Sequence, residues 1–197
     1  RLAVSAVATE LHFLSATEIA ALIKSGEFKA GEKYFLGLDQ LDSEPYFAWN
    51  SDHPKSQSDD APAGYATLRE IGGDLDELQM ELALHSVALS NWHNTHPHCA
   101  RCGAQTSVAM GGAVRKCDAD QSEHYPRTDC AVIVLVHDAD DRILLGRQGI
   151  WPEGRFSCFA GFLEPGETFE QCVQREVFEE SGVAVREINY LGSQPWP

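Results

Sequence analysis

The feature that most constrains the fold is a pattern of glycines, glutamates and one arginine in residues 161–183, GFLEPGETFEQCVQREVFEESGV. A glycine-containing turn leads to Glu167. Thr168 and Gln171 then form the S/T-x-x-E/Q pattern that caps the start of a helix. Gly182 is typical of the residue at which such a helix stops. The pattern therefore predicts a turn followed by a capped helix.

Three glutamates share one face of this helix. Glu176, Glu179 and Glu180 follow at i, i+3 and i+4, whereas Val173 and Val177 form an apolar stripe for burial. Like charges on one face repel unless a positive group neutralises them. Carboxylate oxygens suit Mg²⁺ or Mn²⁺, and Mg²⁺ commonly binds together with substrate phosphates. The alternative interpretation is an ordinary solvated acidic face.

The spacing resembles the signature of the Nudix hydrolases, G-x5-E-x7-R-E-U-x-E-E-x-G-U, in which U is aliphatic. This resemblance implies an α+β fold, a Nudix α/β/α sandwich with a mixed sheet. The nine positions that match the signature are Gly161, Glu167, Arg175, Glu176, Val177, Glu179, Glu180, Gly182 and Val183.

Composition limits the other classes of function. The chain has 197 residues, a length that suits one or two domains, and its net charge of −15 disfavours non-specific binding to duplex nucleic acid. No apolar run approaches the roughly 18 residues of a membrane span. Six cysteines, with a C-x-x-C pair and no secretory signal, indicate cytosolic thiols and metal ligands, so we expect a cytoplasmic protein.

Residues 1–95 are predicted to form a small α+β domain. A helix is expected at 15–26, strands at 33–40 and 44–50, an exposed loop at 51–64, and an amphipathic helix at 75–94. Two histidines of the last helix, His85 and His93, are more often structural than metal ligands.

Residues 96–126 resemble a zinc ribbon. Cys99 and Cys102 form a C-x-x-C-G knuckle, and Cys117 begins a second arm. The identity of the fourth ligand is open. Spacing favours Asp120, whereas chemistry favours His124, because Cys₃His is a common set of ligands in structural zinc sites. A ribbon that folds without metal is the alternative.

Residues 127–197 are predicted to carry the Nudix domain. An apolar strand at 130–138 and a returning strand at 142–148 form an expected hairpin, and alternation predicts another strand at 184–194. The remaining cysteines are expected to be core thiols: Cys130, Cys158 and Cys172.

Two segments, HYPRTD at 124–129 and SQPWP at 193–197, resemble the NADH pyrophosphatase (NudC-like) branch of the Nudix hydrolases. This resemblance implies a homodimer that hydrolyses the diphosphate of NAD(H) to AMP and nicotinamide mononucleotide. Some members of the branch also remove NAD from the 5′ end of capped RNA.

The resemblance also implies roles for individual residues. The catalytic group comprises Glu167, Arg175, Glu176, Glu179 and Glu180, with Arg175 bracing the turn through Glu167. The Mg²⁺ or Mn²⁺ ligands comprise the Ala160 carbonyl, Glu176, Glu179 and Glu180. The expected substrate-binding residues are Arg69, Tyr125, Phe162, Gln194, Pro195, Trp196 and Pro197.

The family continues beyond the position of Pro197 with further strands, a helix and another metal-binding glutamate. We therefore expect that the C-terminal part of the sandwich is missing here, which leaves an apolar sheet edge. Two other functions stay open. The substrate could be ADP-ribose, a dinucleoside polyphosphate or a capped RNA, or the chain could be an inactive binding module for a protein or RNA.

Overall fold

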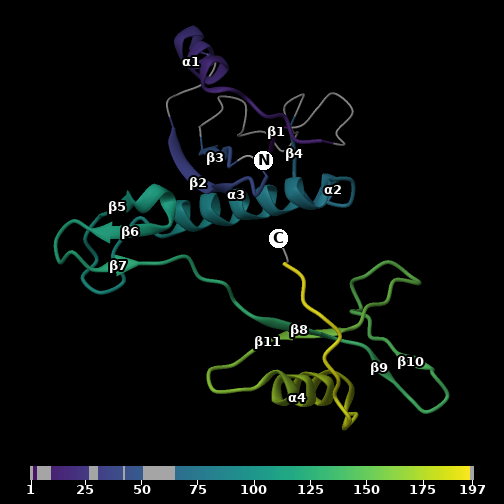
Figure 1. Ribbon diagram of the computed structural model, residues 1–197. Coiled ribbons are helices and arrows are strands. Elements are labelled where there is room, and N and C mark those ends of the chain that lie inside the picture. Colours follow the sequence, from purple (N-terminus) through teal and green to yellow (C-terminus); the bar gives the residue numbers. More distant parts are fainter. Residues whose placement is uncertain (1, 4–9, 27–30, 42, 51–64, 196–197) are drawn as a thin grey trace. The chain divides into compact units, whose positions relative to one another are not determined.

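The computed structural model describes residues 2–3, 10–26, 31–41, 43–50 and 65–195. The chain divides into two compact units, one of residues 1–127 with 194–197 and one of residues 128–193. Helices and strands both occur in each unit (Figure 1), which confirms the α+β class. The predicted loop at 51–64 lies outside the described residues.

The first unit contains the predicted helices and strands. Its elements are β1 (Leu2–Ala3), α1 (Ala16–Ser25), β2 (Glu32–Leu38), β3 (Pro45–Asn50), β4 (Tyr65–Ala66), α2 (Leu68–Ile71), α3 (Glu77–Thr95), β5 (Thr106–Ala109), the 3₁₀ turn η1 (Met110–Gly112), β6 (Val114–Cys117) and β7 (Glu123–His124). The helix α1 starts at a Ser15–Glu18 capping box and stops at Gly26, whose φ is 77°. Strands β2 and β3 pair antiparallel, and β5, β6 and β7 form a three-stranded sheet.

A buried polar network joins α3 to the three-stranded sheet of β5, β6 and β7. The side chain of Arg115 donates from Nε to Thr106 Oγ1 at 2.7 Å, from Nη2 to the Thr106 carbonyl at 2.7 Å, and from Nη1 to His93 Nδ1 at 3.1 Å. On its other side, His93 Nε2 lies 2.8 Å from the Gly112 carbonyl, and the Tyr34 ring stacks on the imidazole. His93 is therefore a satisfied core histidine, as the sequence predicted.

The partners of His93 determine its protonation. A carbonyl oxygen only accepts and a guanidinium only donates, so Nε2 carries the proton and Nδ1 presents a lone pair to Arg115. Burial lowers the pKa of His93, and the Arg115 charge lowers it further, whereas the Gly112 carbonyl and the Glu32 carboxylate act in the opposite direction. The neutral imidazole is thus the form that the fold requires.

We expect the first unit to lose stability as the pH falls below about 6.5, the ordinary pKa of histidine. Because the folded-state pKa of His93 is lowered, the unfolded chain binds the proton first. The stability that neutral His93 contributes is fully present above its pKa in the unfolded chain. It is lost as the pH falls from that value toward the lower pKa of His93 in the folded protein. Urea unfolding at about pH 7.5 and about pH 5.5 measures this, with His93→Gln as the control that hydrogen bonds without titrating. Equal pH dependence in both proteins would contradict the prediction.

The second unit contains β8 (Ala131–Val134), β9 (Val136–His137), β10 (Ile143–Leu144), β11 (Phe159–Phe162) and α4 (Phe169–Ser181). Strands β8 and β11 pair antiparallel, with Gly161 opposite Val132. Helix α4 packs its buried side chains Cys172 and Val173 on Val132, and Val177 is fully buried. The apolar stripe of the predicted helix is thus its buried face.

Three predictions for this unit need correction. The segment 130–138 is two strands, because β8 pairs with β11 while only β9 forms the expected hairpin with β10. Residues 184–194 form no strand in the described part of the chain. Glu187 has a φ of 58°, which breaks the extended backbone that alternation requires. Cys130 is exposed just before β8 and Cys158 is only partly buried, so neither is a core thiol, whereas Cys172 is buried.

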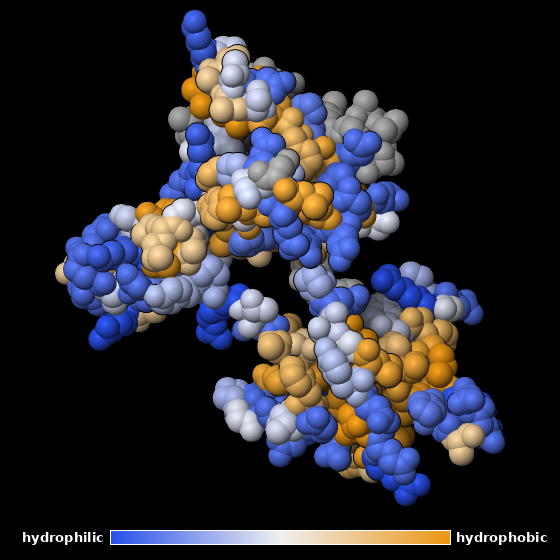
Figure 2. Space-filling view, viewed as in Figure 1, coloured by the Kyte–Doolittle hydropathy of each residue, from blue (hydrophilic) through white to orange (hydrophobic). Residues whose placement is uncertain are grey.

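Apolar side chains are exposed along the β8 and β10 region. Ile133, Leu135 and Ile143 are about half exposed (59%, 49% and 53%), and Figure 2 shows extensive hydrophobic surface on this unit. No helix among the described residues combines the length and hydropathy needed to cross a bilayer.

Candidate functional site

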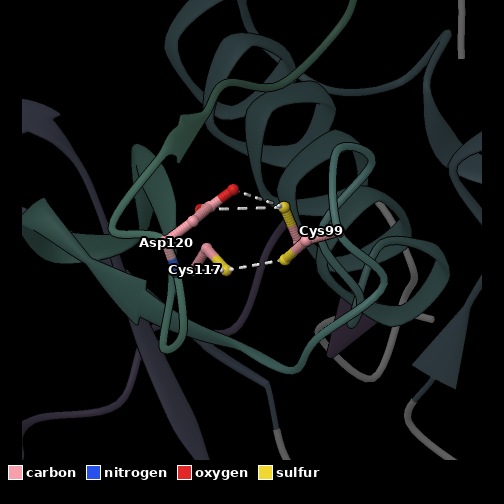
Figure 3. Close-up of side chains that lie close together, drawn as sticks. Cys99, Cys117 and Asp120 are labelled. Carbon is pink, nitrogen blue, oxygen red and sulfur yellow. Dashed lines mark hydrogen bonds between the residues drawn. The ribbon is translucent and has the colours of Figure 1, made fainter.

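Four predicted zinc ligands come together in the first unit. Cys99, Cys102, Cys117 and Asp120 each direct one donor atom into a group whose members all lie within 4.8 Å of one another. Figure 3 shows the Cys99 and Cys117 sulfurs and the Asp120 carboxylate converging from two turns. Three thiols and a carboxylate, two of the thiols buried, suit Zn²⁺. The group could therefore bind a metal ion.

Hydrogen bonds favour the charged forms of two of these donors. The Ser122 hydroxyl, the largest cause, lowers the pKa of Cys99 to about 6. The same hydroxyl and the backbone amide of Ser122 also hold the pKa of Asp120 far below its usual range. Cys102 behaves differently: the backbone hydrogen bond with Ala104 lowers its pKa, but hydrogen bonds with Cys117 and Cys99, together with burial, outweigh it and raise the pKa to about 11. The lowered pKa favours the thiolate form of Cys99, which is the form that binds a metal ion.

The predicted Nudix turn lies between β11 and α4. The amide of Glu164 donates to the Glu167 carboxylate at 3.0 Å, and the amide of Glu167 donates back to the Glu164 carbonyl at 3.0 Å. Helix α4 then starts with the predicted capping box of Thr168 and Gln171, and it stops at Gly182 with φ 72°. The sequence thus predicted the local structure of this segment correctly.

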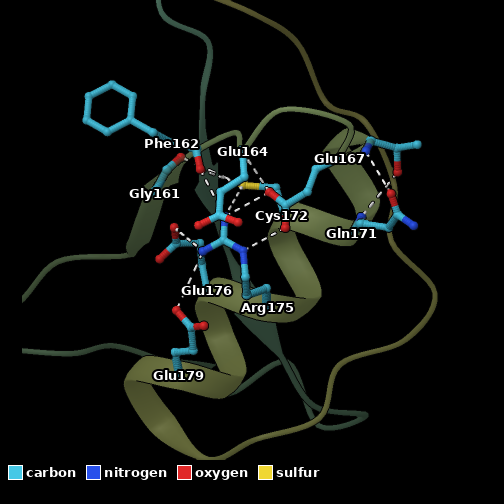
Figure 4. A network of polar contacts seen from close by, with 10 residues as sticks. Gly161, Phe162, Glu164, Glu167, Gln171, Cys172, Arg175, Glu176 and Glu179 are labelled. Carbon is cyan, nitrogen blue, oxygen red and sulfur yellow. Dashed lines mark hydrogen bonds and ion pairs between the residues drawn. The ribbon is translucent and has the colours of Figure 1, made fainter.

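Arg175 holds the turn and the helix together. It donates from Nε and Nη2 to the two oxygens of Glu167 at 2.6 and 2.8 Å, and from Nη2 to the Phe162 carbonyl at 3.0 Å (Figure 4). The hydrogen bond from Arg175 is the main reason that the pKa of Glu167 falls to about 2, and the pKa of Arg175 rises in turn. Both oxygens of Glu167 are occupied, so its geometry suits bracing of the turn.

The face of the helix that carries Glu176, Glu179 and Glu180 is next to this network. Arg175 Nη1 donates to Glu176 Oε1 at 2.8 Å, whereas it lies 3.5 Å from Glu179 Oε2. The side chain of Glu176 is only 15% exposed, Glu179 is 60% exposed, and Glu180 is exposed. Glu176 is therefore largely buried beside the strand, whereas Glu179 and Glu180 are exposed to solvent.

Gly161 allows Glu176 to reach the strand. A Cβ atom at position 161 would lie 1.9 Å from Glu176 Cδ and 2.0 Å from Oε1, so only glycine leaves room for the carboxylate. The close approach places Glu176 beside the backbone that carries the Ala160 carbonyl. Oxygen donors of this kind fit a hard divalent cation, with Ala160, Glu176, Glu179 and Glu180 as the residues that would hold it.

The expected substrate residues are distributed over both units. The ring of Phe162 is 67% exposed and points away from the glutamates in Figure 4. Tyr125 is 60% exposed and donates its hydroxyl to Glu123 at 2.7 Å. Arg69 is exposed on α2, and Gln194 and Pro195 are exposed beyond the last helix. Trp196 and Pro197 lie outside the described residues.

A shallow pocket of about 230 Å³ lies beside Phe162. The sequence interpretation missed four of its five residues. Two of the four, Thr128 and Asp129, lie in the HYPRTD segment, which is a signal that could have indicated them. The full lining is Thr128, Asp129, Cys130, Phe162 and Leu163. The pocket is formed by the backbone pairing of β8 with β11, which the sequence did not predict.

Residues 127–197 match the model of the NUDIX domain. This region therefore belongs to the Nudix family, the class that the turn, the bracing arginine and the acidic helix face define.

The relatives identify the branch. The chain is 48% identical over 138 residues to an NAD-capped RNA hydrolase NudC of Mycobacterium bovis (strain BCG / Pasteur 1173P2), and 47% identical over 138 residues to that of Mycobacterium tuberculosis (strain ATCC 25618 / H37Rv). Each match covers 70% of this chain and 44% of the relative. The human NAD-capped RNA hydrolase NUDT12 is 39% identical over 132 residues, which is 62% of this chain and 29% of the relative. The resemblance to the NudC-like branch is confirmed, and the chain spans less than half the length of these relatives.

Proposed function

We propose that this protein hydrolyses the diphosphate bond of NAD(H) to AMP and nicotinamide mononucleotide, and that it also acts on NAD-capped RNA 5′ ends. The observation that carries the proposal is the arrangement of Glu176, Glu179 and Glu180 beside the Arg175-braced turn. The printed names of the mycobacterial and human relatives support the choice of substrate.

Each group of residues has a separate part in this proposal. Glu176, Glu179, Glu180 and the Ala160 carbonyl would hold Mg²⁺ or Mn²⁺. When bound, such an ion neutralises diphosphate charge and lowers the pKa of bound water. Glu179 or Glu180, both exposed, would position or deprotonate the attacking water. Arg175 and Glu167 keep the glutamate face in place, which matters because phosphoryl transfer depends mainly on positioning and charge.

The exposed ring of Phe162 and its pocket support recognition of a nucleotide base. An aromatic ring that is 67% exposed offers a face for stacking, and the adjoining pocket gives space for the rest of a nucleoside. Tyr125, Arg69 and residues 194–197 are the other proposed substrate contacts. We also propose a homodimer and a cytoplasmic location, the latter supported by six free cysteines.

The test is a comparison of substrates with the 197-residue chain. We expect NADH to release AMP and reduced nicotinamide mononucleotide in the presence of Mg²⁺ or Mn²⁺ and not after chelation, at a higher kcat/KM than ADP-ribose. Faster cleavage of ADP-ribose than of NADH would contradict NAD(H) as the substrate and would favour ADP-ribose, the alternative Nudix substrate. If NADH and ADP-ribose are both cleaved only at the metal-independent background rate, the binding-module hypothesis is favoured.

A further inference from the structure

We infer that the fourth ligand of the cysteine cluster is the carboxylate of Asp120, and that His124 is a hydrogen-bond donor to the Cys99 sulfur outside the ligand set. The site is then Cys₃Asp, not Cys₃His. The inference concerns metal binding by the first unit and does not depend on the proposed hydrolase function.

The first arm of the cluster defines a backbone pattern. The amide of Cys99 donates to the Ala104 carbonyl at 2.7 Å, and the amide of Gly103 donates to the Cys99 carbonyl at 2.9 Å. Gly103 adopts a left-handed φ of 77°. This turn places Cys102, three residues after Cys99, in position to direct its sulfur into the cluster.

The second arm repeats this pattern. The amide of Cys117 donates to the Ser122 carbonyl at 2.8 Å, and the amide of Gln121 donates to the Cys117 carbonyl at 3.1 Å. Gln121 has a left-handed φ of 62°, like the glycine in the first arm. Asp120 therefore occupies the position that corresponds to Cys102. The backbone itself assigns it the role of a ligand.

Two of the separations between ligands are close to those expected around a tetrahedral ion. The Cys102 and Cys117 sulfurs are 3.5 Å apart, and the Cys99 sulfur lies 3.9 and 4.0 Å from the Asp120 oxygens. Ordinary Zn–S and Zn–O bond lengths in a tetrahedron give about 3.8 Å between two sulfurs and about 3.5 Å between sulfur and oxygen. The observed separations agree with these values to within about half an ångström.

Ser122 orients the Asp120 carboxylate. Its amide and hydroxyl donate to Asp120 Oδ1 at 2.9 and 2.5 Å, and Oδ1 and Oδ2 lie 4.0 and 3.9 Å from the Cys99 sulfur. Both hydrogen bonds from Ser122 hold Oδ1, so Oδ2 is the oxygen that we assign to the ion. Outer hydrogen bonds of this kind fix the orientation of metal-binding side chains.

His124 has a different position. Its Nε2 lies 3.2 Å from the Cys99 sulfur and 3.3 Å from the Ser122 hydroxyl, but it contributes no atom to the group of four mutually close donors. An Nε2–H that donates to the Cys99 sulfur accounts for this geometry. The amide of Arg101, 3.3 Å from the same sulfur, donates alongside it. Such donors disperse the excess negative charge of three thiolates and a carboxylate around one divalent ion.

X-ray absorption at the zinc edge tests the assignment on the unaltered chain loaded with one equivalent of Zn²⁺. We expect three sulfur atoms at about 2.3 Å and one oxygen at about 2.0 Å, without the multiple scattering that an imidazole ligand produces. Imidazole scattering, or failure of the metal-free chain to bind zinc, would overturn the inference.

Zinc affinity, measured by competition with a chelator, separates the two roles. We expect His124→Ala to weaken binding by about 10- to 100-fold while leaving one bound ion per chain, as removal of an outer hydrogen bond does. Asp120→Ala should weaken it by more than about 100-fold, and Asp120→Cys should restore tight binding with a four-sulfur absorption spectrum. Asp118→Asn, a change in the same turn but outside the donor group, is the matched control. A larger loss for His124→Ala than for Asp120→Ala would contradict the assignment.

Discussion

Replacement of Glu180 by glutamine is expected to lower the rate of NADH cleavage by on the order of 100- to 1,000-fold and to leave the fold intact. Glu180 is exposed and lies one helical turn beyond Glu176, outside the ion pairs of Arg175. The amide keeps the size of the side chain but removes the negative charge that would bind a divalent cation. The measurement is kcat for NADH at saturating Mg²⁺, together with thermal unfolding.

Glu170→Gln is the matched control for this prediction. Glu170 is an exposed glutamate in the first turn of the same helix, away from the face that carries Glu176 and Glu180. We expect its replacement to leave the rate unchanged. Full activity in Glu180→Gln would contradict the proposal that Glu180 binds the metal ion.

Gly161→Ala is expected to reduce NADH cleavage by about 100-fold while changing the free energy of unfolding by less than about 1 kcal/mol. The added Cβ would lie 1.9 Å from Glu176 Cδ and 2.4 Å from its Cγ, so the Glu176 side chain must move. A flexible side chain can rotate away at low cost to the fold. The carboxylate, however, then leaves the position beside the strand, and a displacement of about 1 Å is sufficient for such a loss of rate.

A double-mutant cycle shows whether Gly161 acts through Glu176. In a Glu176→Gln background, Gly161→Ala should cause little further loss, because the displaced group is already inactive. Gly149→Ala serves as the control for a glycine-to-alanine change, because a Cβ there contacts nothing within 4 Å. Independent, additive losses would show that Gly161 affects the rate by another route.

The helix α4 and its turn were predictable because their determinants are local. Capping by Thr168 and Gln171, the buried stripe of Val173 and Val177, and the stop at Gly182 depend on residues within one or two turns. The bracing role of Arg175 followed from the family resemblance, and the structure shows the bonds to Glu167 that a brace requires.

Strand pairing was less predictable because it depends on residues distant in the chain. The apolar run at 130–138 indicated one strand of a hairpin, but the pairing of β8 with β11 divides it. The segment 184–194 alternates like a strand, yet alternation supplies no hydrogen-bond partner, and the left-handed Glu187 interrupts it. The exposed Cys130 shows the same limit, since its burial depends on where β8 begins.

The sequence by itself determined the class of the site, because an acidic helix face and a cysteine knuckle are set by spacing along a helix and a turn. Only the tertiary structure decided how these groups are used. Glu176 is close to the strand because position 161 has no Cβ, and Asp120, not His124, joins the thiols because the second turn repeats the first. The first outcome depends on close approach between β11 and α4, which local sequence patterns do not encode, whereas the spacing of the second turn already favoured Asp120.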